Sequence, residues 1–138
     1  MRSSRRRRRI VLAAALSCLA VALPAWAGSY LDRCALLLSQ GGRDAEAVRV
    51  RLSDRELARV AHELATTRVR AASRMRVPPE VAQAHPHLLL VLENYERALA
   101  AAAEGEPPRF FVYLERARGE ERTFHSVLKQ LGWTLPEL

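Results

Sequence analysis

The chain has 138 residues, which is room for one domain, and a formal net charge of +7. Residues 1–27 hold six of its 22 basic residues and none of its 15 acidic ones, so residues 28–138 carry 16 basic against 15 acidic side chains. The basic character therefore belongs to the N-terminal segment, and the remaining chain gives no indication of nucleic-acid binding. Of the two cysteines only Cys34 lies beyond that segment, which excludes an intrachain disulfide in residues 28–138.

The N-terminal segment has the three parts of an export signal. The basic run Arg5–Arg9 is followed by an apolar stretch, Ile10–Leu23, and then by the small-residue site Ala25-Trp26-Ala27. This order is typical of a cleaved signal peptide, with cleavage before Gly28. The sequence therefore predicts a signal peptide at residues 1–27, a mature domain at residues 28–138, and a location in the periplasm or outside the cell.

Three alternatives to simple cleavage stay open for this segment. Residues 10–27 are nearly long enough to remain as a membrane anchor, although Pro24 and the small-residue site favour cleavage. Cys18 loosely resembles a lipoprotein cleavage site, and the arginine run loosely fits a twin-arginine export pattern. After cleavage no membrane span is expected.

The first mature helix is predicted to begin near Ser29, with Leu31, Cys34 and Leu38 on one apolar face. Burial on this face would leave the single thiol inert. Two helical glycines cost about 2 kcal/mol relative to alanine, so Gly41-Gly42 predicts a helix that is bent or broken there.

The second helix is predicted from a capping box, Ser53-Asp54-Arg55-Glu56, to about Arg76. On its exposed face Arg59 and Glu63 stand four residues apart and are expected to pair. Pro78-Pro79 ends the helix and begins the next element.

The third predicted helix carries the most regular apolar stripe in the chain. It is expected to begin afresh or kink at Pro86, after a short turn over residues 80–84, and to stop before Gly105. Its apolar residues recur every three or four positions: Leu88, Val91, Leu92, Tyr95, Ala98, Leu99 and Ala102. Such a face cannot remain in water, so the rest of the chain is expected to cover it.

The fourth helix is predicted from about Pro107 to Leu131, continuous through Gly119. Gly132 is expected to end it in a Schellman-type turn, with Trp133 folding back as the hydrophobic contact. Four apolar-faced helices joined by short turns predict an all-α, antiparallel up-down-up-down four-helix bundle.

No catalytic or cofactor motif accompanies this pattern. The sequence has no Cys-x-x-Cys-His, no His-Glu-x-x-His, no glycine-rich phosphate loop and no Gly-x-Ser-x-Gly. We therefore expect no enzyme and no bound cofactor. The leading interpretation is a small exported bundle with a binding or structural role, acting on an unknown protein partner or on its own copy.

An alternative function comes from the histidines. A hairpin of the third and fourth helices would bring His87 level with His125, with His85 nearby and Glu121 one turn from His125. Imidazoles and a carboxylate are ligands for Zn or Cu, so the alternative is a periplasmic metal- or haem-binding bundle. The only carboxylate of this group, Glu121, lies on the predicted core face; the structural explanation is that it pairs at the bundle edge.

Overall fold

The computed structural model describes the backbone of residues 4–138 and the side chains of residues 27–138. Over this part of the chain the structure has four α-helices, one 3-10 turn and no strand, which confirms an all-helical fold. The elements are α1 (Ser4–Val50), α2 (Arg55–Ser73), η1 (Pro79–Val81), α3 (His85–Glu104) and α4 (Pro107–Gln130). The predicted signal segment lies outside the residues with described side chains, except for Ala27. Within residues 27–138, no helix is long and apolar enough to cross a membrane.

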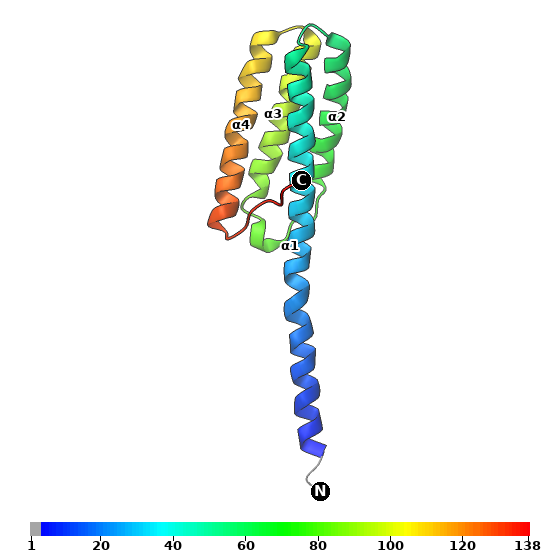
Figure 1. The fold of residues 1–138 in the computed structure, drawn as a ribbon, viewed down its shortest axis with the longest axis vertical. Helices are drawn as coiled ribbons and strands as arrows, with labels where there is room; N and C mark the ends of the chain where they lie inside the picture. The colour runs from blue at the N-terminus through cyan, green and yellow to red at the C-terminus, as the bar shows by residue number, and fades with distance from the viewer. Residues whose placement is uncertain (1–3) are drawn as a thin grey trace.

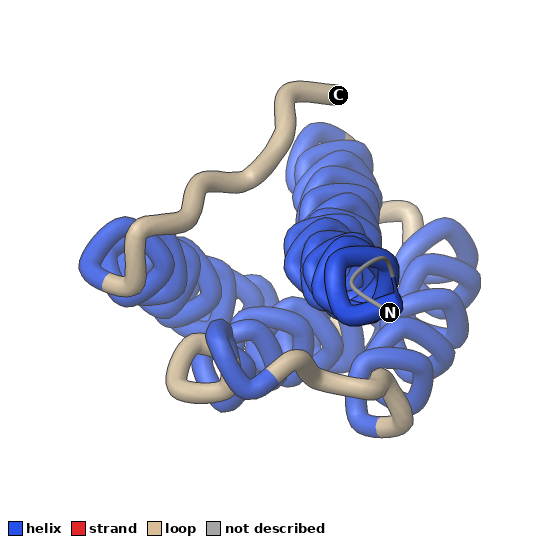
Figure 2. Tube along the Cα trace, turned by 90° about the horizontal axis from the view of Figure 1, so that it is seen from below, coloured by secondary structure: helices blue, strands red, loops and turns tan. Residues whose placement is uncertain are grey.

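Helix α3 is the centre of the bundle. It packs against α1, α2 and α4, whereas α1 also packs against α2. Figure 2 shows α2 and α4 on opposite sides of α3, with α1 lying over α3 on the side of α2. The loops after α1 and α3 lie at one end of the bundle, and the connection from α2 to α3 lies at the other (Figure 1).

The predicted apolar stripe of α3 forms the core. All seven of its residues are buried, and they meet buried side chains of the other helices. From α4 these are Phe110, Leu114, Ala117, Phe124 and Leu128. From α1 they include Tyr30, Leu31, Cys34, Leu38 and Val48, and α2 contributes alanines. Small residues on α2 let its backbone lie close to α3.

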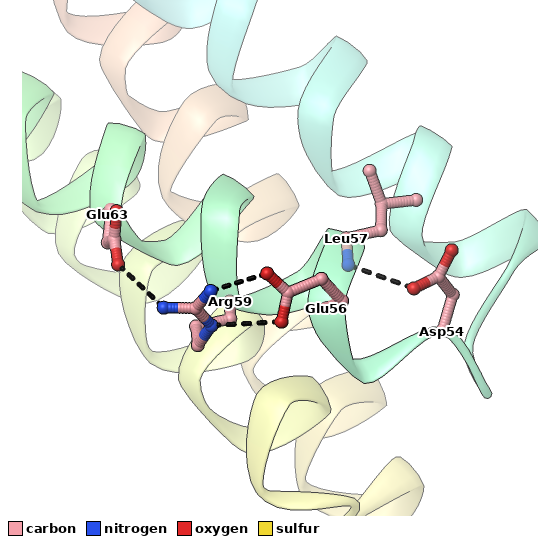
Figure 3. Close-up of polar contacts among 5 residues, drawn as sticks. All are labelled: Asp54, Glu56, Leu57, Arg59 and Glu63. Atoms are coloured by element: carbon pink, nitrogen blue, oxygen red, sulfur yellow. Dashed lines mark hydrogen bonds and ion pairs between the residues drawn. The ribbon is translucent and has the colours of Figure 1, made fainter.

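The start of α2 is one residue later than the capping box suggested. Asp54, not Ser53, is the N-cap, and its carboxylate accepts the backbone N–H of Leu57 at 2.9 Å (Figure 3). An aspartate here satisfies an otherwise free amide of the first turn. The predicted pair of Arg59 and Glu63 is present at 3.5 Å, and Arg59 also binds Glu56.

A glycine follows the last turn of α3 and another follows the last turn of α4, as the sequence predicted. Gly105 has a φ of 78°, and the N–H of Glu106 donates to Ala101 O at 2.9 Å, which is a Schellman turn. At the other end Gly132 has a φ of 86°, and the N–H of Trp133 donates to Leu128 O at 2.9 Å. The predicted fresh start at Pro86 also holds, because this proline occupies the first turn of α3.

The predicted break at Gly41-Gly42 is wrong, whereas the start near Ser29, which was predicted for the chain after cleavage, stays a prediction. Helix α1 begins at Ser4 and runs without interruption to Val50. A methyl group on Gly41 would lie 3.2 Å from Cδ2 of Tyr95, and one on Gly42 would lie 3.6 Å from the Tyr95 hydroxyl. The glycines therefore serve close packing of α1 against an aromatic ring of α3 rather than a turn.

Candidate functional site

A hollow of the bundle lies between α1, α4 and the C-terminal tail, which we define as residues 133–138. We call it the α1–α4 groove; it has a volume of about 380 Å³. Its lining comes from three segments: Ala35, Leu38, Ser39 and Arg43 of α1, Glu121 and His125 of α4, and Leu135, Pro136, Glu137 and Leu138 of the tail. Figure 2 shows the tail running from the end of α4 across to α1, so the tail bounds the groove.

The groove exists because α1 and α4 each pack on α3 from different sides. Alanine and leucine of α1 form its apolar part together with Leu135, while charged side chains lie along its edges. A second hollow of about 330 Å³ continues along α4 and is lined by Arg118, Glu121, Arg122 and His125. The two hollows share Glu121 and His125 and therefore form one surface.

Tyr95 joins the three helices around the groove. Its ring, from α3, lies over Gly41 of α1, and its hydroxyl donates a hydrogen bond to Oε2 of Glu121 on α4 at 3.2 Å. Burial, the charge of Glu121 and this hydrogen bond raise the pKa of Tyr95 to about 12. The phenol therefore stays protonated at neutral pH and acts as a fixed donor.

Glu121 also faces His125, one turn further along α4. The Nε2 atom of His125 lies 3.9 Å from Oε1 of Glu121, and the His125 side chain is 49% exposed. Glu121 is thus held by a hydrogen bond on one side and by a solvent-exposed imidazole on the other. The explanation from the sequence was that Glu121 snorkels or pairs with an arginine at the bundle edge; in the structure it does pair, but with Tyr95 and His125.

The four predicted metal ligands lie in three separate contacts. Nδ1 of His85 is 2.9 Å from the Tyr30 hydroxyl, Nδ1 of His87 is 3.1 Å from Oε2 of Glu120, and His125 faces Glu121. Among the residues with described side chains, no group of three or more His, Cys, Asp or Glu is placed to hold a metal ion. The metal site stays a prediction. In this structure the predicted ligands do not come together in one place: His87 lies beside Glu120, and His125 lies beside Glu121.

A partly buried polar chain lies at the end of the bundle where α3 begins. The ring of His85 bonds the backbone of Ala72 in α2, and its Nδ1 atom lies within hydrogen-bond distance, 2.9 Å, of the Tyr30 hydroxyl of α1. Tyr30 in turn contacts Cys34, whose pKa burial raises to about 11. Burial also lowers the pKa of His85. The thiol is fully buried and protonated, as the sequence predicted, and His85 ties α1, α2 and α3 together in its neutral form.

Sequence reasoning missed both Tyr95 and the tail as parts of a site. In the sequence, Tyr95 is indistinguishable from the other apolar residues of the stripe, because its position in the helix gives no sign that its hydroxyl reaches Glu121. The pair Gly41-Gly42 was the available signal, since glycine also marks places where another chain segment approaches closely. The tail gives no periodic signal at all.

Comparisons of the chain with protein-family models, with curated proteins and with solved structures found no match.

Proposed function

We propose that the protein is an exported, non-enzymatic helical bundle that binds a segment of another protein, or of a second copy, in the α1–α4 groove. The observation that carries the proposal is the groove itself, whose lining combines apolar side chains of α1 and the tail with charged side chains of α1 and α4. Apolar surface gives affinity to such a site, and a few placed polar groups orient the ligand.

The chemistry along the groove favours binding over catalysis. A tyrosine whose pKa is raised to about 12 is a weak nucleophile and a weak base at neutral pH. Glu121, its partner, is occupied by the tyrosine hydroxyl. The half-exposed ring of His125 faces the carboxylate of Glu121, and among the described side chains no hydrogen bond joins it to Ser39, the hydroxyl residue that lines the same groove.

The length of α1 supports export with cleavage before Gly28. At 1.5 Å per residue, residues 28–50 span about 35 Å, and α4 with its 24 residues spans about 36 Å. Cleavage would thus leave a first helix matched in length to the fourth, in an antiparallel up-down-up-down bundle. Tyr30, Leu31 and Cys34, the first strongly packed residues after the site, would all be retained.

Site-specific photo-crosslinking in the exporting cell tests this function. A photoreactive amino acid replaces Ser39, which lines the groove, and in a control protein it replaces Arg59, on the exposed face of α2. We expect an adduct with one defined polypeptide, identified by mass spectrometry, from position 39 and none from position 59. No adduct, or the same adducts from both positions, would contradict the proposal.

The intact mass of the protein purified from the exported fraction tests export. An intact mass beginning at Gly28 is expected, because Ala25 and Ala27 provide the small residues that signal peptidase accepts. A lipid-modified Cys18 or an unprocessed chain in the membrane fraction would contradict it.

A further inference from the structure

The tail leaves α4 in a fixed direction but is weakly held after that. The Schellman turn at Gly132 fixes the backbone as far as Trp133. Beyond it, the backbone of residues 134–138, all within the described chain, makes no hydrogen bond to the backbone of α1 or α4. Only Trp133 and Leu135 pack against the core, and Leu138 is 70% exposed. The tail therefore rests on the groove through a few side chains.

The charges of the tail and of the groove edges are complementary. The tail carries Glu137, whereas the edges carry Arg43 on α1 and two arginines on α4, Arg118 and Arg122. Glu121 is the only carboxylate of the helices that lines either hollow. An extended segment with apolar and acidic residues thus fits both the floor and the edges of this surface.

We infer that the α1–α4 groove is a binding site for extended peptide segments that combine apolar side chains with carboxylates, and that the tail is its built-in competitor. The inference rests on the proposed function, since it names the ligand chemistry of the same groove. In this structure Leu135 of the tail packs against the core and forms part of the apolar lining of the groove. A ligand segment of similar composition displaces the tail. Little free energy is lost in this exchange, because no backbone hydrogen bond between the tail and the helices has to break.

A labelled peptide tests this competition in purified protein. The peptide has the sequence of residues 132–138, GWTLPEL, with a free carboxylate and an N-terminal fluorophore, and binding is followed by anisotropy. The exported protein is compared with a variant that ends at Gly132 and with the full chain carrying Leu135→Ser, which loosens the tail without removing it. If the tail occupies the groove about nine-tenths of the time, removing it strengthens peptide binding about tenfold.

We expect the shortened variant to bind the peptide about tenfold more tightly than the exported protein, and Leu135→Ser to lie between them. Circular dichroism and urea unfolding establish that each variant is folded. Equal affinity for all three proteins, or no binding by any of them, would overturn the inference. Should the shortened variant fail to fold, the comparison of Leu135→Ser with the exported protein decides the question in the same way.

A charge reversal locates the peptide. In the shortened variant, Arg43→Glu at the groove edge should weaken binding by about threefold or more, because it opposes the peptide's carboxylates. The matched control is Arg33→Glu, also on α1 but lining a different hollow, between α1 and α2. Equal effects of the two reversals would contradict binding in the groove. Because no cellular partner is present, a negative peptide result together with a positive crosslink from Ser39 overturns only the ligand chemistry and leaves the proposed function standing.

Discussion

Tyr95 of α3 contacts both α1 and α4. Its ring fits against Gly41 of α1, and its hydroxyl holds Glu121 of α4, so one residue positions both walls of the groove. The cost of two glycines in α1 is therefore offset by aromatic packing. Sequence alone could not show this, because the cost of a helical glycine is a local property and its compensation comes from another helix.

Two glycine substitutions separate these local and tertiary effects. Gly119→Ala in α4 should raise the free energy of unfolding by about 1 kcal/mol, because alanine is the better helix former and the nearest atom, at the end of the Arg122 side chain, is 3.8 Å away. Gly41→Ala should give no such gain, because its methyl group presses on the Tyr95 ring at 3.2 Å. Urea unfolding measures both variants, and equal stabilisation would show that the ring adjusts freely.

His85 gives the bundle a pH dependence with a definite sign. Burial lowers its pKa in the folded state below the ordinary value of 6.5, so the unfolded chain takes up a proton first as the pH falls. The free energy of unfolding should therefore be highest above pH 6.5 and decline as the pH falls below it, levelling off once the folded pKa has been passed.

Urea unfolding between pH 8 and pH 5 measures this decline. We expect His85→Gln to unfold more readily at pH 8, since it disturbs the contacts to Tyr30 and Ala72, but to lose most of the decline. The control is His125→Gln, whose half-exposed ring should leave the decline intact. The same decline in all three proteins would mean that other groups cause it.

At the scale of elements, α3 shows what the spacing of apolar residues in the sequence can predict about a helix. The stripe of leucine, valine and alanine correctly identified its buried face, and Pro86 and Gly105 its ends, because the cause of each lies within a few residues in sequence. The capping residue of α2 was misassigned by one position, since Ser53 and Asp54 both fit an N-cap and only the backbone angles distinguish them. Contacts between elements, such as that of His87 with Glu120, depended on side-chain directions that spacing does not give.

Two leucines two positions apart on α3 test the assigned faces. Leu88 is fully buried, and Leu88→Ala should lower the free energy of unfolding by about 2–5 kcal/mol through lost burial and the resulting cavity. Leu90 is 40% exposed, and Leu90→Ala should cost less than about 1 kcal/mol. Similar losses in urea unfolding would place the helix in another rotation.

The whole molecule is arranged around the central helix α3, and the other three helices differ in how many neighbours they pack against. Helix α3 packs against all three neighbours, whereas α4 packs mainly on α3 and α1 is separated from α4 by the groove. Such an arrangement predicts unequal local stability. The sequence predicted the number of helices and the buried core but not the unequal packing of the helices. Every helix carries an apolar face, and the sequence does not show which helix that face packs against.

Amide hydrogen exchange measures the asymmetry. The amides of α3 should exchange most slowly, at rates set by global unfolding, and those of α4 should exchange faster through opening of the α3–α4 contact alone. Uniform protection of the two helices would indicate that the bundle opens only as a unit.

Trp133 stands at the base of the tail, and its partly buried indole packs against the core. The other tryptophan of the chain, Trp26, lies in the segment that signal cleavage would remove. A chain beginning at Gly28 thus carries a single indole fluorophore, located where the tail leaves α4. Its emission should shift to longer wavelength when the tail lifts into water, so the unlabelled protein would report the state of its own groove.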